Sequence, residues 1–309
     1  MPDDSESASG DTGDASVASV EGAFSVLGDE TRLRILLELA EVAGNRGIGA
    51  GLAFSELRQR VGVDDSGRFN YHLRKLEDGF VEKTDGEYVA RFPALAVVSA
   101  VYAGTYRDVD DAPSRTTEID IECQLCDRPL QAHYEEHTLW LECVEHGRSD
   151  EFSVVPPGAY RDRGLEELVR VVYTRTLVNL FLARRGICLQ CWGPMSIDYP
   201  VGTPLSDGAD GLDELVGTDV HCERCWNRSL SPLRTVVATH PLVLGFHREH
   251  GYDLLDTVVN VTRVGDASAC ESEPHGTDPA SATVRITLDG ETLALAIDET
   301  CTVVDYRWQ

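Results

Sequence analysis

The second half of the chain contains two Cys-x-x-Cys pairs, Cys188-Leu189-Gln190-Cys191 and Cys222-Glu223-Arg224-Cys225. A two-residue gap places both thiols of a pair on one tight turn, and two such turns complete the tetrahedral ligand set that Zn²⁺ prefers. Four thiolates leave no coordination position for water, so this spacing predicts a structural zinc site and argues against catalysis. We expect zinc bound by these cysteines to stabilise the surrounding segment as a zinc ribbon.

A second ligand set precedes these pairs and consists of Cys123, Cys126, Cys143 and His146. The segments between its halves, Leu130–Glu135 and His137–Glu142, alternate roughly as two strands, which is typical of a zinc ribbon. His133 and His137 are nearby and are the alternatives to His146 as the fourth ligand. Both lie between the two ligand turns, where a strand or loop role is the simpler interpretation. The sequence thus predicts two structural Zn²⁺ ions.

Two alternatives concern the cysteines. The Cys-x-x-Cys pairs could be redox pairs of thioredoxin type, but neither opens a helix after a strand with the usual small residues between. Cys270 and Cys301 match no motif. Free thiols in a reducing compartment are favoured for these two over a disulfide or a sensor.

The charge of the chain is unusual. Its 309 residues include 53 acidic and 27 basic ones, a net charge of −26, and the only lysines are Lys75 and Lys83. The negative charges of such a surface repel one another at low salt, and added salt screens this repulsion. The balance resembles that of cytosolic proteins from halophilic archaea that accumulate salt. A merely acidic protein is the alternative.

No secretion signal or apolar run of membrane length is visible. Residues 1–19 are acidic and rich in Ser, Gly and Ala, which predicts a disordered tail. We therefore expect a cytoplasmic protein with no membrane partner.

The segment 20–107 shows a regular succession of elements. Its pattern predicts a helix over 20–40, a loop over 41–51, short helices over 54–61 and 68–79, and a final helix over 94–107. Phe80–Lys83 and Glu87–Arg91 predict a hairpin across Asp85-Gly86. This order indicates a winged helix-turn-helix. An acidic linker follows over 108–117.

Three stretches carry a family resemblance. Residues 27–36, LGDETRLRIL, resemble the opening helix of ArsR-type regulators; 69–76, FNYHLRKL, resemble their recognition helix; and 77–81, EDGFV, resemble the turn into their wing. The whole architecture resembles ArsR-like regulators of haloarchaea with a C-terminal zinc-ribbon region. The resemblance implies a dimeric DNA reader, with dimer contacts through helices near 20–40 and 94–107. The usual metal-sensing cysteines are missing, because no cysteine precedes Cys123.

The window from Glu56 to Lys83 is electrically neutral, with six acidic and six basic residues. An electrically neutral segment in an anionic protein suits a surface that approaches phosphates, because it repels them less than the rest of the protein does. We assign base contacts to Arg68, Asn70 and Tyr71, near the start of the predicted recognition helix, and phosphate contacts to Arg74, Lys75 and Lys83. The alternative is a solvated helix used for protein contacts. His72 lies beside the apolar stripe, which favours packing.

The remaining segments are a first ribbon over 118–152, a connecting helix within 153–186, a second ribbon over 187–232, and a helix plus β-rich segment over 233–309. In the last segment we expect a helix near 239–250, strands over 257–264, 283–288, 292–297 and 302–306, and a hairpin turn at Asp289-Gly290. The apolar stripe of Gly164–Gly186 is wide, which indicates either domain core or a dimer interface. Acidic residues in both ribbons argue against direct DNA contact by them.

Together these patterns predict an α+β protein that binds double-stranded DNA as a homodimer and regulates transcription. An alternative is a general factor that resembles archaeal transcription factor E and contacts RNA polymerase. An enzyme is the third hypothesis, and we expect none because no zinc-hydrolase motif, nucleophile elbow or phosphate loop occurs.

Overall fold

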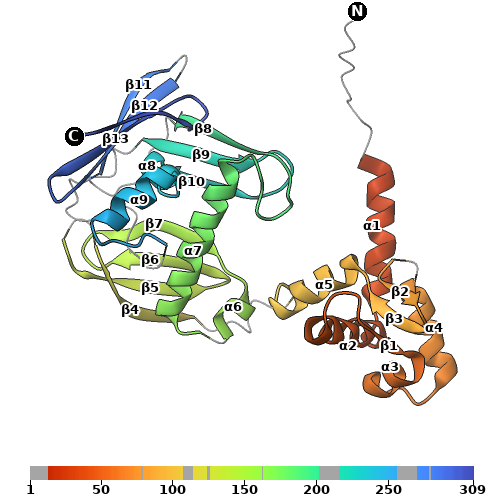
Figure 1. Cartoon of the computed structure of the whole chain (residues 1–309). Coiled ribbons are helices and arrows are strands. Elements are labelled where there is room, and N and C mark those ends of the chain that lie inside the picture. The colour runs from red at the N-terminus through yellow and green to blue at the C-terminus, as the bar shows by residue number, and fades with distance from the viewer. Residues whose placement is uncertain are drawn as a thin grey trace, which may run out of the picture. The chain divides into compact units, whose positions relative to one another are not determined.

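The computed structural model describes residues 13–77, 79–106, 114–123, 126–161, 163–201, 216–255, 270–277 and 280–309. The chain divides into two compact units, Met1–Tyr106 and Arg107–Gln309. Helices are combined with small antiparallel sheets of three or four strands (Figure 1), which confirms the mixed α+β class. No helix in the described ranges is both long and apolar enough to cross a membrane.

The first unit has a three-stranded sheet of order β1-β3-β2 together with helices. Its elements are α1 (Gly13–Leu27), α2 (Glu30–Arg46), β1 (Gly51–Ala53), α3 (Phe54–Val61), α4 (Ser66–Glu77), β2 (Val81–Thr84), β3 (Glu87–Ala90) and α5 (Phe92–Tyr102).

Helix α1 begins at Gly13, so residues 13–19 are helical where the sequence predicted a disordered tail. Val17, Val20 and Phe24 recur at helical spacing, and this periodicity outweighs the polar composition. Residues 1–12 of the expected tail lie outside the described residues.

The helix expected over 20–40 is two helices, which separate at Gly28-Asp29. Helix α2 then continues to Arg46, because Val42 and Ala43 extend its buried face into the expected loop. Strand β1 was not expected, since three residues are too short to show alternation. It pairs Gly51 with Val89, where a Cβ on Gly51 would lie 2.6 Å from the Tyr88 carbonyl oxygen. Only glycine allows this close approach.

Helix α4 begins two residues earlier than predicted. The backbone carbonyl of Asp65 accepts from Phe69 N at 3.0 Å, and the Asp65 carboxylate accepts from Gly67 N and Arg68 N at 2.7 and 2.9 Å. These backbone N–H donors lower the pKa of Asp65. The carboxylate therefore caps the helix at its positive end.

The apolar stripe of α4 is buried as predicted. Phe69, Leu73 and Leu76 are fully inaccessible and belong to a core that includes Ile35, Leu36 and Leu39 of α2. Phe54 packs edge-on against Phe69 with ring centroids 5.2 Å apart. The β2–β3 hairpin is also confirmed, because Asp85 and Gly86 adopt φ of 53° and 89°. Two positive φ values are what the tight two-residue turn requires.

Asp29 joins the start of α2 to α4. Its Oδ1 accepts from Arg32 N at 3.0 Å and lies 3.2 Å from Nδ1 of His72, which is buried as the packing interpretation predicted. Burial raises the pKa of Asp29, but the Arg32 hydrogen bond and the His72 charge outweigh it and leave the pKa below 3.8. The ionised form is therefore favoured by folding, and its contribution is lost as pH falls through the lowered pKa.

Replacement of Asp29 by alanine removes the cap of α2 and the contact with His72. We expect Asp29→Ala to lower the free energy of unfolding by ~1 kcal/mol at neutral pH, and Asp29→Asn, which can still cap, by less. Urea titrations of both variants measure the effect. The difference in free energy of unfolding between the wild type and the alanine variant should shrink as the solution is acidified. A difference that grew on acidification would contradict the role of the ionised carboxylate.

The second unit begins with a four-stranded antiparallel sheet of order β4-β5-β6-β7. Its strands are β4 (Arg115–Glu122), β5 (Pro129–Glu135), β6 (Thr138–Cys143) and β7 (Gly147–Val154). Strand β4 starts inside the linker expected over 108–117, of which residues 107–113 lie outside the described residues. The predicted two-stranded ribbon is thus the centre of a wider sheet.

Two helices follow the first sheet, α6 (Pro157–Arg161) and α7 (Leu165–Ala183), where one connecting helix was expected. The first half of α7, with Leu165 and Leu168, packs into the core of the first sheet. Its last turn, with Leu180 and Ala183, belongs to a separate core with the following sheets. Figure 1 shows α7 running from one sheet toward the next. The wide apolar stripe is therefore explained by two successive cores of one chain.

The rest of the unit contains two further sheets, of order β10-β9-β8 and β11-β12-β13-β14. The elements are β8 (Met195–Val201), β9 (Gly217–Cys222), β10 (Arg228–Pro232), α8 (Leu233–Val237), α9 (Pro241–Glu249), β11 (Cys270–Thr277), β12 (Ala280–Leu288), β13 (Glu291–Ile297) and β14 (Val303–Trp308).

The helix near 239–250 and the last three strands were predicted. So was the turn at Asp289-Gly290, whose φ values are 51° and 87°. Helix α8 and strand β11 were not expected. The strand expected over 257–264 lies outside the described residues.

Candidate metal centres and the exposed face of α4

The first ligand set comes together at one end of the first sheet. Cys123 follows β4, Cys126 precedes β5, Cys143 ends β6, and His146 lies in the turn before β7. Sγ of Cys126 and Cys143 are 3.6 Å apart, and Nδ1 of His146 is 3.6 Å from Sγ of Cys123 and 3.5 Å from Sγ of Cys143. All four ligand atoms lie within 4.8 Å of one another. These residues could therefore hold one metal ion.

The neighbouring histidines do not join this set. His133 stacks on Trp140 with centroids 5.1 Å apart, and its Nε2 lies 3.3 Å from a Glu142 carboxylate oxygen. His137 lies in the β5–β6 turn with φ of 65°. His146 is therefore the histidine that the structure brings to the three thiols, as predicted.

The second ligand set comes from the end of α7 and the β9–β10 turn. Sγ atoms of Cys188 and Cys225 are 3.7 Å apart, and those of Cys191 and Cys222 are 3.5 Å apart, with all four within 4.8 Å of one another. A tetrahedral ion with metal–sulfur bonds of about 2.3 Å holds its sulfurs about 3.8 Å apart, whereas a disulfide needs about 2.05 Å. No disulfide forms among the nine cysteines, all of which are described. The geometry fits a bound metal.

Hydrogen-bond donors surround the thiols of both sets. Burial raises the pKa of Cys143, but backbone donors at Glu145 and His146 outweigh it and lower the pKa to about 6. Burial also raises the pKa of Cys188, and donors that include backbone Cys191 and side-chain Asn227 lower it to about 6. Thiolates are the metal-binding form, so these donors favour ionisation of one thiol in each set. In the second set the backbone donor at Asn227 is outweighed by burial and by the neighbouring thiols, which raise the pKa of Cys225 to about 12.

Asn227 was not singled out from the sequence. Its Nδ2 donates to Sγ of Cys188 at 3.4 Å and to Oδ1 of Asn179 on α7 at 2.9 Å. These hydrogen bonds connect the second metal set to α7. Asn227 is not itself a candidate ligand, but it holds the thiol of the ligand Cys188 in place. No spacing rule links Asn179 to Asn227, so only the fold reveals this pair.

The face of α4 opposite its buried stripe carries the predicted DNA-contacting residues. Arg68, Tyr71, Arg74 and Lys75 are exposed and Asn70 is half-buried. Gly67, Asn70, Tyr71, Arg74 and Lys75 line an open hollow of about 440 Å³.

Lys83 is exposed on β2, with Nζ 5.2 Å from the centre of the Tyr88 ring. Within the described ranges, no carboxylate lies within ion-pair distance of Arg68, Arg74, Lys75 or Lys83.

Comparison with known proteins gives two matches to protein families. The description "Domain of unknown function (DUF7351)" matches residues 120–303, more than half of the 309 residues. The chain belongs to the DUF7351 family. A second description, "Domain of unknown function (DUF7347)", matches residues 20–101. No curated protein and no solved structure matches the chain.

The boundaries of the two matches follow the two units of the structure. The DUF7351 region contains all eight candidate metal ligands and both cores on which α7 packs. The DUF7347 region contains α4 and the β2–β3 hairpin. The candidate metal ligands and the cationic face of α4 thus lie in regions matched by two different family descriptions.

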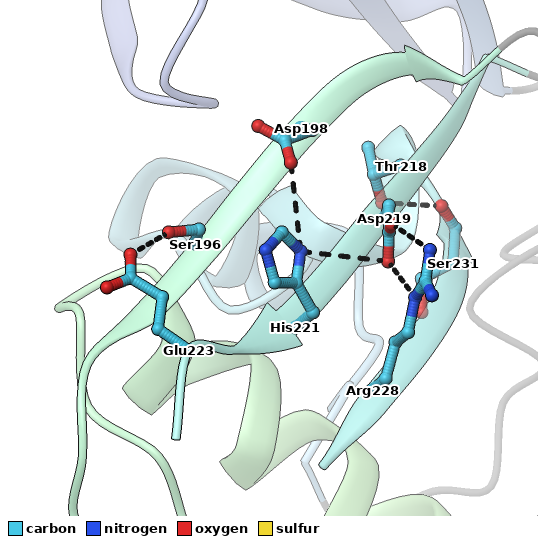
Figure 2. Close-up of polar contacts among 8 residues, drawn as sticks. All are labelled: Ser196, Asp198, Thr218, Asp219, His221, Glu223, Arg228 and Ser231. Atoms are coloured by element: carbon cyan, nitrogen blue, oxygen red, sulfur yellow. Dashed lines mark hydrogen bonds and ion pairs between the residues drawn. The ribbon is translucent and has the colours of Figure 1, made fainter. Parts of the chain in front are cut away.

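A polar cluster on β8–β10 of the DUF7351 region was not predicted (Figure 2). Asp198 and Asp219 are cross-strand partners, and Nδ1 of His221 lies 3.7 Å from the first and 3.8 Å from the second. Arg228 donates to both carboxylate oxygens of Asp219 at 2.9 and 2.6 Å and so lowers the pKa of Asp219. Opposed carboxylates repel each other, and Arg228 offsets this repulsion. The cluster aligns the strands beside the second metal set.

Cys270 and Cys301 lie outside both metal sets. Burial raises the pKa of Cys270 to about 11 and that of Cys301 to about 12. Both thiols are therefore protonated near neutral pH and poor nucleophiles.

Proposed function

We propose that this DUF7351-family chain is a sequence-specific regulator of transcription that binds double-stranded DNA through a winged helix-turn-helix in residues 20–107. One observation carries the proposal. Helix α4 buries Phe69, Leu73 and Leu76 completely, and on its other side it exposes Arg68, Arg74 and Lys75, for which the described part of the chain shows no side-chain ion pair. In a chain of charge −26, such a face suits a polyanion.

The arrangement of short elements supports the proposal. Helices α3 and α4 are joined by a tight turn at Gly62, which has φ of 75°, and the β2–β3 hairpin follows α4 directly. In a helix-turn-helix the second helix enters the major groove, with its N-terminal residues nearest the bases. Arg68 and Asn70 fit guanine and adenine edges, respectively. Arg74, Lys75 and Lys83 on the hairpin suit phosphates.

Zn²⁺ is the metal that we propose for both sets. Their ligands are seven thiols and one imidazole, which is the donor chemistry of structural zinc and leaves no open position in a four-coordinate ion. Bound zinc would tie together the chain segments that carry the ligands, and the residues themselves supply the ordered donors already described.

A homodimer is part of the proposal, with contacts through the helices that flank the winged unit. Val20 and Phe24 on α1 are 52% and 59% exposed, and Tyr102 on α5 is 61% exposed. Large apolar side chains at such positions favour burial in an interface.

We expect Phe24→Glu to shift the protein from dimer to monomer, because a carboxylate placed in an apolar contact loses its hydration without gaining a partner. Light scattering over a range of protein concentrations measures the mass. Ile48→Glu is the control, since Ile48 is 87% exposed in the loop between α2 and β1 and belongs to neither α1 nor α5. A variant mass equal to that of the wild type would contradict this dimer interface.

Footprinting tests the proposed function and separates it from the alternative of a general factor. The full chain should protect one defined duplex site in the absence of RNA polymerase. Protection that appears only when polymerase is added would favour the general factor and contradict the regulator.

A further inference from the structure

The second metal set has a tryptophan directly after each Cys-x-x-Cys pair. Trp192 is 85% exposed and Trp226 is 72% exposed. The other tryptophans are better packed: Trp140 stacks on His133, and Trp308 contacts Phe246 with ring centroids 5.3 Å apart. Burial of indole is among the largest apolar contributions to folding. Folding alone therefore does not account for two tryptophans displayed on adjacent metal-binding turns.

The backbone at Trp192 strengthens this point. Its φ is 62°, in the left-handed region that bulky residues rarely adopt and where glycine is favoured. A glycine at this position would adopt the same φ without steric strain. A strained and exposed side chain is more simply explained by a ligand than by packing.

The two turns lie against each other. A Cβ built on Gly193, the residue after Trp192, would lie 3.2 Å from Cβ and 3.3 Å from Nε of Arg224. Arg224 in turn belongs to the turn that leads into Trp226. Glu223 N also donates to the Pro194 carbonyl at 3.1 Å. We call Trp192, Arg224 and Trp226 the knuckle surface.

The two metal-binding turns and their flanks contain more basic than acidic residues. Residues 184–194 and 222–228 include four arginines and one acidic residue, and of these arginines Arg228 is paired with Asp219. Arg185 and Arg224 are exposed, and neither is paired with a carboxylate in the described ranges. The acidic residues that argued against nucleic-acid contact by this ribbon, 207–214, lie outside the described residues. Arg185 donates to the Phe181 carbonyl at 3.1 Å and lies over the Phe181 ring, whereas Arg224 lies beside Gly193 on the adjoining turn. The described turns thus offer exposed aromatic rings together with two exposed guanidinium groups that have no carboxylate partner in the described ranges.

We propose that the knuckle surface binds single-stranded RNA. Unpaired bases stack on indole rings whatever their sequence, and guanidinium groups hold the phosphates between them. A duplex is disfavoured as the occupant because its bases already stack on one another.

Glu223 favours RNA over single-stranded DNA. Its carboxylate repels phosphate but accepts a hydroxyl, and Oε1 already accepts the Ser196 hydroxyl at 2.6 Å (Figure 2). The other oxygen is left for a ribose 2′-hydroxyl. This activity is distinct from duplex binding by α4.

Anisotropy of a labelled oligoribonucleotide of mixed sequence, titrated with the full-length protein, tests the proposal. Trp192→Gly and Trp226→Ala should each weaken binding about tenfold or more, from the stacking lost per base. Tyr306→Ala, an exposed aromatic on β14, should leave the affinity unchanged. Arg185→Gln and Arg224→Gln should each reduce the slope of log affinity against log salt by about 0.7. A variant with Arg68 and Asn70 replaced should retain RNA affinity.

Two measurements guard against an indirect effect. Metal content should stay at the wild-type value in both tryptophan variants, and Trp192→Gly should melt no lower than the wild type, because glycine relieves the left-handed residue. Unchanged RNA affinity in both tryptophan variants would overturn the proposal. Equal affinity for single-stranded DNA of the same sequence would overturn the choice of RNA. Self-association lost in Trp192→Gly, without RNA binding by the wild type, would show a second copy as the occupant and overturn it also.

Discussion

Replacement of Arg68 and Asn70 by alanine is expected to abolish preference for the best duplex site while leaving the fold intact. Each bidentate base contact contributes about 1–3 kcal/mol of discrimination, so the pair should cost a factor of about 30 or more in affinity. Both side chains lie on the face of α4 that its core does not use. Fluorescence anisotropy with the preferred duplex and with a scrambled one measures the specific and the non-specific affinity for DNA separately.

The controls separate base reading from general attraction. Arg46→Ala removes an exposed arginine at the end of α2 and should have little effect. Arg74→Ala and Lys75→Ala should weaken the preferred and scrambled duplexes alike and should each reduce the salt slope by about 0.9. If the double variant at Arg68 and Asn70 kept wild-type selectivity, α4 would not be the reading helix.

The second large effect concerns the metal set of four thiols. Cys188→Ser is expected to release one metal ion and unfold the segment that contains β8–β10. Binding of a structural zinc supplies an apparent ~10–16 kcal/mol, which exceeds or equals the ~5–15 kcal/mol by which domains are stable. Cys188 is fully buried and receives the Asn227 hydrogen bond, so the hydroxyl cannot take over its role.

Metal analysis and circular dichroism measure this outcome together. The wild type should contain two zinc ions per chain and the variant one, with loss of strand signal. Cys270→Ser is the matched control, because Cys270 belongs to neither metal set, and it should keep both ions. A Cys188→Ser protein that retained two ions and its wild-type melting curve would show that this set is not a structural metal site.

The metal ligands could be predicted from the sequence because their spacing is local. Each Cys-x-x-Cys turn is specified by four residues, and the fold only had to bring the turns together. The hairpin turns at Asp85-Gly86 and Asp289-Gly290 were predictable for the same reason, since positive φ at both positions selects these residues.

The elements that were missed lack such local signals. Strand β11 contains Pro274 and Gly276, which predict a turn, yet it is the edge strand of its sheet, where proline is tolerated. Strand β4 alternates only in its second half, where Ile119 is buried and Ile121 is half-buried, and its first half is exposed. The Asn179–Asn227 contact and the exposure of Trp192 depend on the packing of α7 and the metal-binding turns, which no short window of sequence contains.

Selection of duplexes from a randomised library by the full-length protein tests most directly whether α4, with its exposed cations, reads DNA. We predict enrichment of one motif, in two copies related by symmetry if the protein is a dimer. The same selection with Asn70→Ala should lose the preference for adenine at one position of each copy. A wild-type selection that enriched no motif, although the protein was folded and loaded with metal, would contradict the account.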